Sequence, residues 1–69
     1  MREQLSTGIR VACIKNGTSI VEAAEKADIG KSVIYRYIQG KSDVGIDKMN
    51  QFCVDGLGMT MAEVVELGK

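Results

Sequence analysis

The segment from Ser19 to Gly40 constrains the fold most, because two short helical patterns follow one another there across a very short break. The first pattern begins at Ser19, and Glu22 stands at the spacing of a capping box, in which the serine oxygen accepts a backbone N–H and the glutamate reaches back. The alanines of EAAEKA give this helix a small-residue face that another helix can approach closely. Asp28-Ile29-Gly30 then interrupts the pattern, and a second helix is predicted from about Lys31 to Gln39.

This second helix has two chemically different sides. At about 100° per residue, its polar side chains fall within a sector of roughly 140°. Its apolar side chains fill the opposite side, which we expect to pack on a core. Two short helices joined by a tight turn, the second with a basic and hydrogen-bonding outer side, predict a helix-turn-helix. The polar sector consists of Lys31, Ser32, Tyr35 and Arg36, and the apolar side consists of Val33, Ile34, Tyr37 and Ile38.

The polar side suits the major groove of DNA, which admits one α-helix and presents hydrogen-bonding base edges to it. Lys31 and Arg36 are expected to donate to guanine O6 or N7, and Ser32 is able to donate or accept. Tyr35 leaves two interpretations open, a contact with DNA or half-buried packing within the protein. Taken alone, each cation is a solvated surface charge, as most exposed charges are; within this motif, DNA contact is favoured.

Further contacts are expected with the DNA backbone, which position a protein without reading sequence. Lys41 and Ser42 follow the second helix directly and are predicted to make such contacts. Arg10 and Lys15 are interpreted as surface residues, with a backbone contact as the less favoured alternative.

Helical spacing of apolar residues predicts two longer helices on either side of this segment. The first runs from about Arg2 to Lys15 and is closed by Asn16-Gly17, because glycine readily adopts the left-handed conformation that ends a helix. The other has Asp47 in its first turn, where the helix dipole favours an anion, and is expected to end at Gly56 and Gly58. The inward positions are Leu5, Ile9, Ala12 and Cys13 in the first helix, and Ile46, Met49, Phe52, Cys53 and Leu57 in the other.

A last short helix is predicted from Thr60, with Glu63 completing a second capping box. Its apolar side chains leave two interpretations open: they cover the core of this domain, or they pair with a second copy of the chain. Met59, Met61 and Val65 are the positions at which we expect a dimer contact. No run of residues alternates with the period of a strand, so the sequence predicts a compact all-α domain of five helices.

The chain length and composition favour a binding module. The 69 residues leave room for one domain, residues 1–69, and little space for an enclosed active site. Proline is absent, and 45% hydrophobic with 26% charged residues is an ordinary globular balance. No apolar run approaches the roughly 20 residues needed to span a bilayer. The first residues lack the apolar core of a signal peptide, so we expect a cytoplasmic protein.

The residues that most often carry catalysis or bind metal are scarce. Histidine is absent, and Cys13 and Cys53 form no CxxC pair, so we expect no metal site and two reduced thiols packed as small apolar groups. A nucleophile–base pair and a glycine-rich phosphate loop are missing too. The sequence therefore predicts a protein that is not an enzyme, with no catalytic residue, cofactor or small-molecule ligand.

The formal net charge is zero, which by itself argues against a nucleic-acid-binding protein. The charges are unevenly distributed, however. Residues 16–30 carry three acidic side chains against Lys26, whereas three cations and no anion occur between Lys31 and Lys41. Positive charge is therefore concentrated in the segment that is predicted to meet DNA.

The stretch SIVEAAEKADIGKSVIYRYIQGK resembles the helix-turn-helix of the phage repressor, Cro and xenobiotic-response-element family, which reads roughly T-Q-x-E-L-A-x-K-A-G-V-S-x-x-T-I-S-R-x-E-N-G-K. The order of the five helices resembles this family over nearly the whole chain. The resemblance implies a lambda-repressor-like fold, double-stranded operator DNA as the partner, and a homodimer on half-sites roughly one helical turn apart. It also implies base contacts from the early residues of the third helix, that is, from the polar sector. The matching residues are Glu22, Ala24, Lys26, Ala27, Ile29, Ile34, Arg36, Gly40 and Lys41.

Three features depart from the family pattern. Ile20 stands where a glutamine commonly clamps a phosphate, so the Ser19 hydroxyl or neighbouring amides are expected to make that backbone contact instead. Asp28 replaces the glycine of the turn, although it tolerates unusual backbone angles less easily, and we expect its charge to face away from phosphate. Near Gly56 the chain is one residue longer than the family's usual ending, which is expected to shift the last helix.

The sequence therefore predicts a sequence-specific transcriptional regulator of phage or prophage type, Cro-like or repressor-like, that reads a palindromic operator through the major groove. The neutral net charge and Ile20 keep an alternative open, a protein-interaction module on the same fold that does not bind DNA. Salt dependence separates the two, because the release of counterions makes DNA binding steeply salt-dependent.

Overall fold

Helices make up most of the computed structural model, which describes residues 2–69. Met1, at which the predicted domain begins, lies outside the described residues. No strand forms in residues 2–69, which confirms the predicted all-α class, and none of the described helices has the length and apolar character that crossing a membrane requires. The elements in order are α1 (Arg2–Lys15), α2 (Ile20–Lys26), α3 (Lys31–Ile38), α4 (Ile46–Gln51), the π-helical segment η1 (Phe52–Leu57) and α5 (Met61–Leu67).

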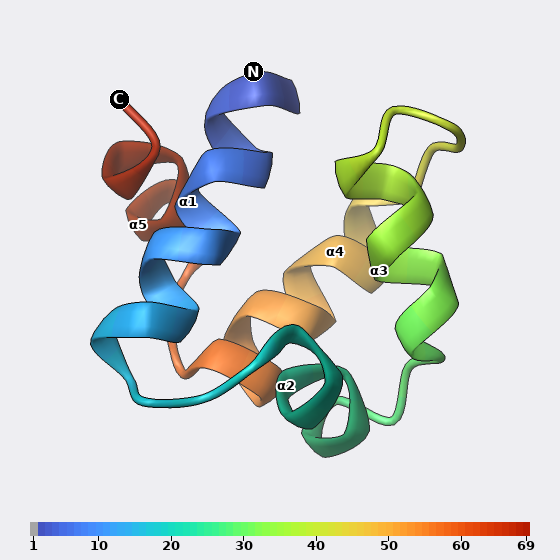
Figure 1. The fold of residues 1–69 in the computed structure, drawn as a ribbon, viewed down its shortest axis with the longest axis horizontal. Helices are drawn as coiled ribbons and strands as arrows, with labels where there is room; N and C mark the ends of the chain where they lie inside the picture. Colours follow the sequence, from blue (N-terminus) through green and yellow to red (C-terminus); the bar gives the residue numbers. More distant parts are fainter. Residues whose placement is uncertain (1) are drawn as a thin grey trace.

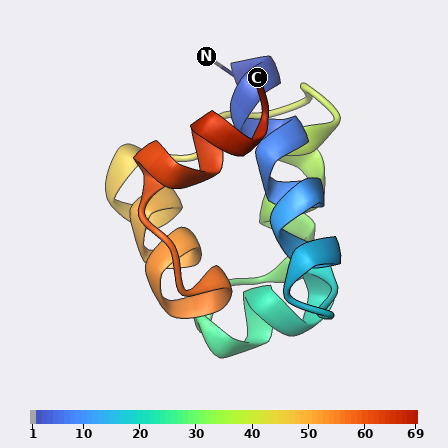
Figure 2. The ribbon, with the colours of Figure 1, turned by 90° about the vertical axis from the view of Figure 1, so that its left-hand side faces the viewer.

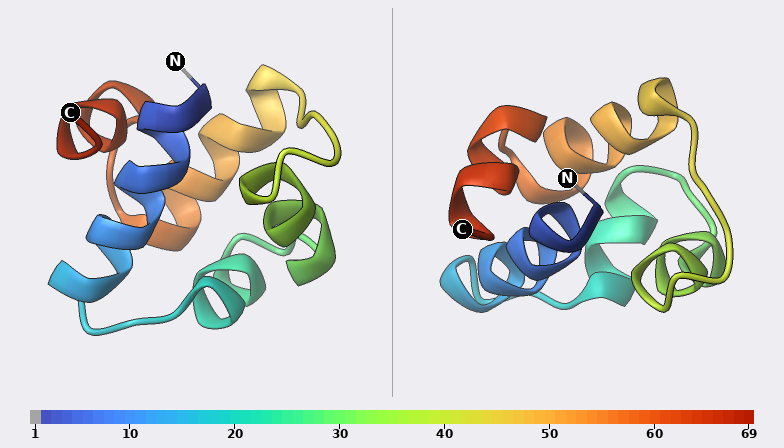
Figure 3. Two further views of the ribbon diagram at one scale, coloured as in Figure 1. Left: turned by 45° about the horizontal axis from the view of Figure 1, so that its top comes forward. Right: turned by 90° about the horizontal axis from the view of Figure 1, so that it is seen from above.

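The helices surround a shared core. In Figure 1, α1 and α5 lie side by side at one edge of the molecule, and α3 lies at the opposite edge. The view from above confirms that α4 and η1 run between these edges (Figure 3). The last residues of the chain return to the beginning of α1 (Figure 2), where Gly68 lies against Gln4. Because α3 lies at the edge of the molecule, its outer side is left uncovered by the other helices.

The core consists of apolar side chains from every helix, as the spacing predicts. All four inward positions predicted in the first helix are buried, and Ile9, Ile34, Phe52 and Val64 are completely removed from solvent. Each such large side chain contributes about 1.5–3 kcal/mol by leaving water. The buried set is Leu5, Ile9, Ala12, Cys13, Ala23, Ala24, Ala27, Ile29, Ile34, Tyr37, Met49, Phe52, Cys53, Leu57 and Val64.

The prediction for Ile46 is wrong, since this side chain is 69% exposed. Ile46 is the first residue of α4, and the helix starts at the surface after the loop. The inward side of α4 therefore begins almost one turn later, at Met49, which is buried.

The two predicted capping boxes form to different extents. Thr60 and Glu63 make the complete box at the start of α5. At the start of α2, the Ser19 hydroxyl accepts the N–H of Glu22 at 3.2 Å, but the Glu22 carboxylate lies 3.5 Å from that hydroxyl instead of binding the Ser19 backbone N–H. The serine therefore caps α2 without the reciprocal half of the box.

The fourth helix departs from the prediction in its winding. It is an α-helix only through Gln51 and continues as a π-helix from Phe52 to Leu57. A π-helical turn holds more residues than an α-helical turn, because its hydrogen bonds span five residues instead of four. Gly56 and Leu57 are both buried within this wider winding.

Gly56 does not end the helix, which corrects that part of the prediction. It is buried within η1, where an added Cβ would lie 2.5 Å from the carbonyl oxygen of Ala23 in α2. The helix ends at Gly58, whose φ of +70° is the left-handed conformation expected of a terminating glycine. The buried glycine is thus a contact between two helix backbones.

α1 and α5 also meet backbone to backbone. A Cβ added to Gly8 would collide with the carbonyl group of Val64, and one added to Gly68 would collide with the carbonyl group of Gln4. Glycine inside a helix costs about 1 kcal/mol relative to alanine, so Gly8 weakens α1 on its own. The close approach of α5 is the physical reason for a glycine at this position.

Replacing Gly8 with alanine should lower the free energy of unfolding by roughly 1–3 kcal/mol, because overpacking outweighs the gain in helix propensity. Urea unfolding followed by circular dichroism measures the change. Gly45→Ala is the matched control and should change little, because Gly45 has a φ of −59° and an added Cβ would meet no atom within 4 Å. A Gly8→Ala protein as stable as the wild type would contradict the close contact between α1 and α5.

Candidate nucleic-acid interface

The turn between α2 and α3 has an unusual backbone. α2 ends at its C-cap Ala27, and Asp28 follows with a φ of +57°, in the left-handed region that favours glycine. The N–H groups of Asp28 and Ile29 donate to the carbonyl oxygens of Glu25 and Ala24, at 3.1 and 2.9 Å. Ile29 is buried and anchors the turn in the core, while the Asp28 side chain is exposed. The direction in which α3 leaves α2 therefore depends on a strained residue.

α3 buries one side and exposes the other, as its sequence predicts. Ile34 and Tyr37 are buried, and Val33 and Ile38 are partly buried against the core. Tyr35 is 39% exposed, so its ring is partly covered and still accessible. The exposed side, called the reading face below, brings together Lys31, Ser32, Tyr35 and Arg36.

The cations of this segment have no anionic partner within the described part of the chain. Lys31, Arg36 and Lys41 are exposed, and no ion pair in that part involves them. An ion pair is found instead in the C-terminal region, between Lys69 and Glu66 at 3.0 Å. Because no carboxylate neutralises the three cations, this edge of the molecule presents positive potential to an approaching polyanion.

The residues predicted to contact the DNA backbone lie at both ends of the helix-turn-helix. Ser19 is the N-cap of α2, and Lys41 follows α3, with its N–H bound to the carbonyl oxygen of Arg36 at 2.9 Å. Lys41 is exposed and Ser42 is half-buried. Ile20 packs against the core, so a hydrocarbon side chain fixes the start of α2 where the family pattern has a glutamine.

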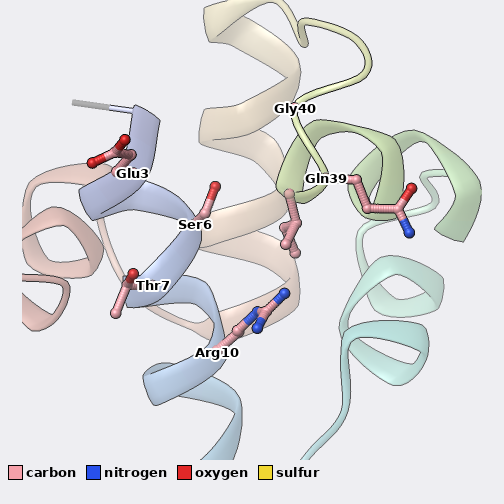
Figure 4. Close-up of a pocket in the computed structure, with 7 residues that line it drawn as sticks. Glu3, Ser6, Thr7, Arg10, Gln39 and Gly40 are labelled. Carbon is pink, nitrogen blue, oxygen red and sulfur yellow. The ribbon is translucent and has the colours of Figure 1, made fainter.

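A polar pocket of about 390 Å³ lies between the first half of α1 and the end of α3. In Figure 4 the Arg10 side chain points from α1 toward the end of α3, where Gln39 and Gly40 line the pocket. Lys15 lies at the far end of α1, away from α3 (Figure 1). Of the two α1 cations left open by the sequence, the fold brings Arg10 near the C-terminal end of α3.

Two side-chain amides tie this region to the rest of the chain, and no sequence pattern predicts either contact. Nε2 of Gln51, at the end of α4, donates to the carbonyl oxygen of Ala27 at 2.6 Å. Nδ2 of Asn16 donates to the carbonyl oxygen of Leu57 at 3.2 Å, which secures the loop before α2 to the end of η1. Both amides bind carbonyl groups that are distant in the sequence, so only the tertiary structure reveals them.

Cys13 and Cys53 are buried free thiols, as the sequence predicts. Burial raises the pKa of both thiols, and that of Cys53 rises to about 11. A thiol with so high a pKa is protonated at neutral pH and is a poor nucleophile. These two side chains therefore pack in the core as small apolar groups.

Comparison with known proteins identifies the same region of the chain. A family model described as helix-turn-helix matches residues 9–53, which include all of α2, the turn at Asp28 and all of α3. Together with the five-helix architecture, this match confirms the predicted lambda-repressor-like fold. No curated protein and no solved structure matches the chain.

Replacing Asp28 with glycine should raise the free energy of unfolding by about 1 kcal/mol, because glycine adopts a positive φ without the steric cost of a Cβ. The midpoint of urea unfolding measures the gain. Asp55→Gly is the matched control, since Asp55 is an exposed acid inside η1, and this change should destabilise by roughly 0.5–1 kcal/mol. A loss of stability in Asp28→Gly would argue against the left-handed turn.

Proposed function

We propose that this chain, which belongs to the helix-turn-helix family, is a sequence-specific transcriptional regulator that reads a palindromic DNA operator as a homodimer. Family membership makes it a DNA-binding regulator; the palindrome, the dimer and a phage or prophage role are the finer parts of the proposal. The observation that supports the reading of DNA sequence is the reading face, which is exposed and unneutralised while the other side of α3 is fixed in the core. A helix held in this way can enter the major groove without changing shape.

The proposed roles of the reading face follow from its chemistry. Arg36 offers two parallel N–H donors to O6 and N7 of a guanine, and Lys31 offers a single charged donor near the start of the helix. Ser32 donates to or accepts from a neighbouring base. Tyr35 contributes its exposed edge to a thymine methyl group or its hydroxyl to a phosphate.

The backbone contacts are proposed to surround this face. Lys41 and Ser42 bind the DNA strand that passes the end of α3, and the start of α2 binds through Ser19 or the amides next to it. Arg10 is a further candidate, because its exposed guanidinium extends toward the end of α3. Such contacts supply affinity and fix the orientation of the protein.

A homodimer is proposed because one copy has little electrostatic attraction for DNA. Only a few cations stand beside the reading face of one copy, so a single domain releases few counterions, and two linked copies double the contacts. The outer side of α5 is suited to self-association: Met61 and Val65 are only partly buried and, with Ala62, line an apolar depression. Met59, also partly buried, precedes the helix.

The position of α5 supports this interface. α3 and α5 lie at opposite edges along the longest dimension of the molecule, which is 23 Å between outermost Cα atoms. A two-fold axis beside α5 would therefore place the two α3 helices at the outer ends of the dimer. Each α3 would then be free to lie in a half-site of its own.

The alternative, a protein-interaction module, has two observations in its favour. The net charge is zero, and Ile20 is packed against the core where a phosphate-binding amide stands in the family pattern. Such a module would bind a protein partner with an affinity that depends little on salt, and it would select no duplex.

Selection from random duplexes at low salt should enrich a palindromic sequence to which two copies of the chain bind, with an affinity that falls steeply as salt rises. Gel shifts measure affinity, and sedimentation of the complex measures stoichiometry. Enrichment of no sequence would contradict sequence-specific binding and favour the interaction module.

Two charge substitutions test the proposed dimer contact within this experiment. Ala62→Glu places a charge on the exposed outer side of α5 and should prevent the second copy from binding cooperatively. Ile46→Glu introduces the same charge at another exposed apolar position and should leave the stoichiometry at two. Cooperative binding by Ala62→Glu would place the contact between copies elsewhere.

Replacing Arg36 with alanine should weaken binding to the selected operator by roughly 1–3 kcal/mol and relax the preference at one base position, because a bidentate base contact is lost. Competition between the operator and its single-base variants measures both effects. Lys15→Ala removes one positive charge at the end of α1 that lies away from α3 and serves as the control. Equal weakening on every sequence would instead assign Arg36 a phosphate contact.

A further inference from the structure

Gln51 makes a hydrogen bond that ends on the turn of the helix-turn-helix. Its Nε2 donates to the carbonyl oxygen of Ala27 at 2.6 Å, across 24 positions of sequence. Ala27 is the buried C-cap of α2. The carbonyl group that is bound belongs to the peptide unit leading into Asp28, the residue with a positive φ. A side chain of α4 thus fixes the backbone at the point where α2 turns toward α3.

The surroundings of Gln51 include the loop after α3 as well as the turn at Ala27. Gln51 also lines a pocket of about 460 Å³ together with Val33 of α3 and Val44 of the following loop. The pocket is open to solvent and is lined mostly by the loop after α3 and the first turn of α4, and Val33 is its one lining residue from α3. The hydrogen bond from Gln51 joins α4 to the C-cap of α2, directly before the turn that leads to α3.

We propose that Gln51 is a positioning residue, which sets the angle at which α3 presents its reading face by tying the turn at Ala27 to α4. The inference rests on the proposed reading of DNA by α3. Hydrogen bonds to base edges weaken steeply when donor and acceptor are misaligned. Long cationic side chains that contact phosphates adjust to a small rotation of the helix. Loss of the tie therefore affects the reading of sequence more than general attraction to DNA.

The exposure of Gln51 and the partial burial of its hydrogen bond suit this role. Gln51 is exposed as a residue, and its carbon chain adds little to the core, so its effect on global stability is small. The bond it makes is partly buried, where water competes less well for the carbonyl group. Its neighbour Asn50 is also exposed and makes no such bond, which provides a matched position on the same helix.

The test compares Gln51→Met, which keeps the length but has no donor, with Gln51→Glu, which keeps the shape but can only accept. Asn50→Met and Asn50→Glu are the controls for hydrophobicity and charge. Relative to its control, each Gln51 variant should lose about fivefold to tenfold in affinity for the selected operator and keep its affinity for an unrelated duplex. Equal losses on both duplexes, or no loss on either, would overturn the proposal.

A second measurement on the free protein keeps this inference separate from the proposed function. In Gln51→Met, the backbone amides of Asp28 and Ile29 should exchange with solvent about fivefold faster, while the Val64 amide in α5 should be unaffected. If the wild-type chain selects no duplex, the proposed function fails, and amide exchange still decides whether Gln51 fixes the turn. Unchanged exchange at Asp28 and Ile29 would show that it does not.

Discussion

The backbone contact between Gly56 in η1 and the carbonyl group of Ala23 determines where the helix-turn-helix lies on the core. No side chain separates the two segments there, and Ala23 and Ala24 are completely buried. α3 follows α2 after a turn of only a few residues, so its position depends on this contact. With α2 fixed, Ile34 and Tyr37 are sufficient to hold α3 by one side and leave the other side free.

The π-helical winding of η1 makes that contact compatible with the rest of the core. Each additional residue in an α-helix rotates all later residues by about 100°. An insertion near Gly56 would therefore turn Leu57 away from the core if the helix remained α-helical throughout. With the wider π turn, Leu57 is buried and α5 begins where it can reach α1.

Apolar periodicity predicted the helices and most of the core, because a helix with one buried face has apolar residues at regular spacing along its own sequence. The exposed side of α3 followed from the same pattern. Gly8, Gly56 and Gln51 gave no such signal, since glycine has no side chain to count and an exposed amide has no hydrophobic period. Their partners lie far along the chain, as Gly8 and Val64 show.

Two further differences have local causes. Ile46 continues the apolar spacing of the fourth helix. The spacing does not show, however, at which residue of a helix the packing against other helices begins. Gly56 and Gly58 look alike in the sequence as helix terminators. Only Gly58 has a positive φ, and Gly56 was retained inside η1 by the proximity of α2.

The close contact between α1 and α5 also affects how the chain acquires its structure during synthesis. α1 is translated before α5, the helix that covers it. Contacts between residues so distant in sequence slow folding, and a nascent chain that lacks them exposes apolar surface to chaperones. A chain without η1 and α5 would lack the contacts that hold α2 and α1 in place, so such a copy would not compete for the operator.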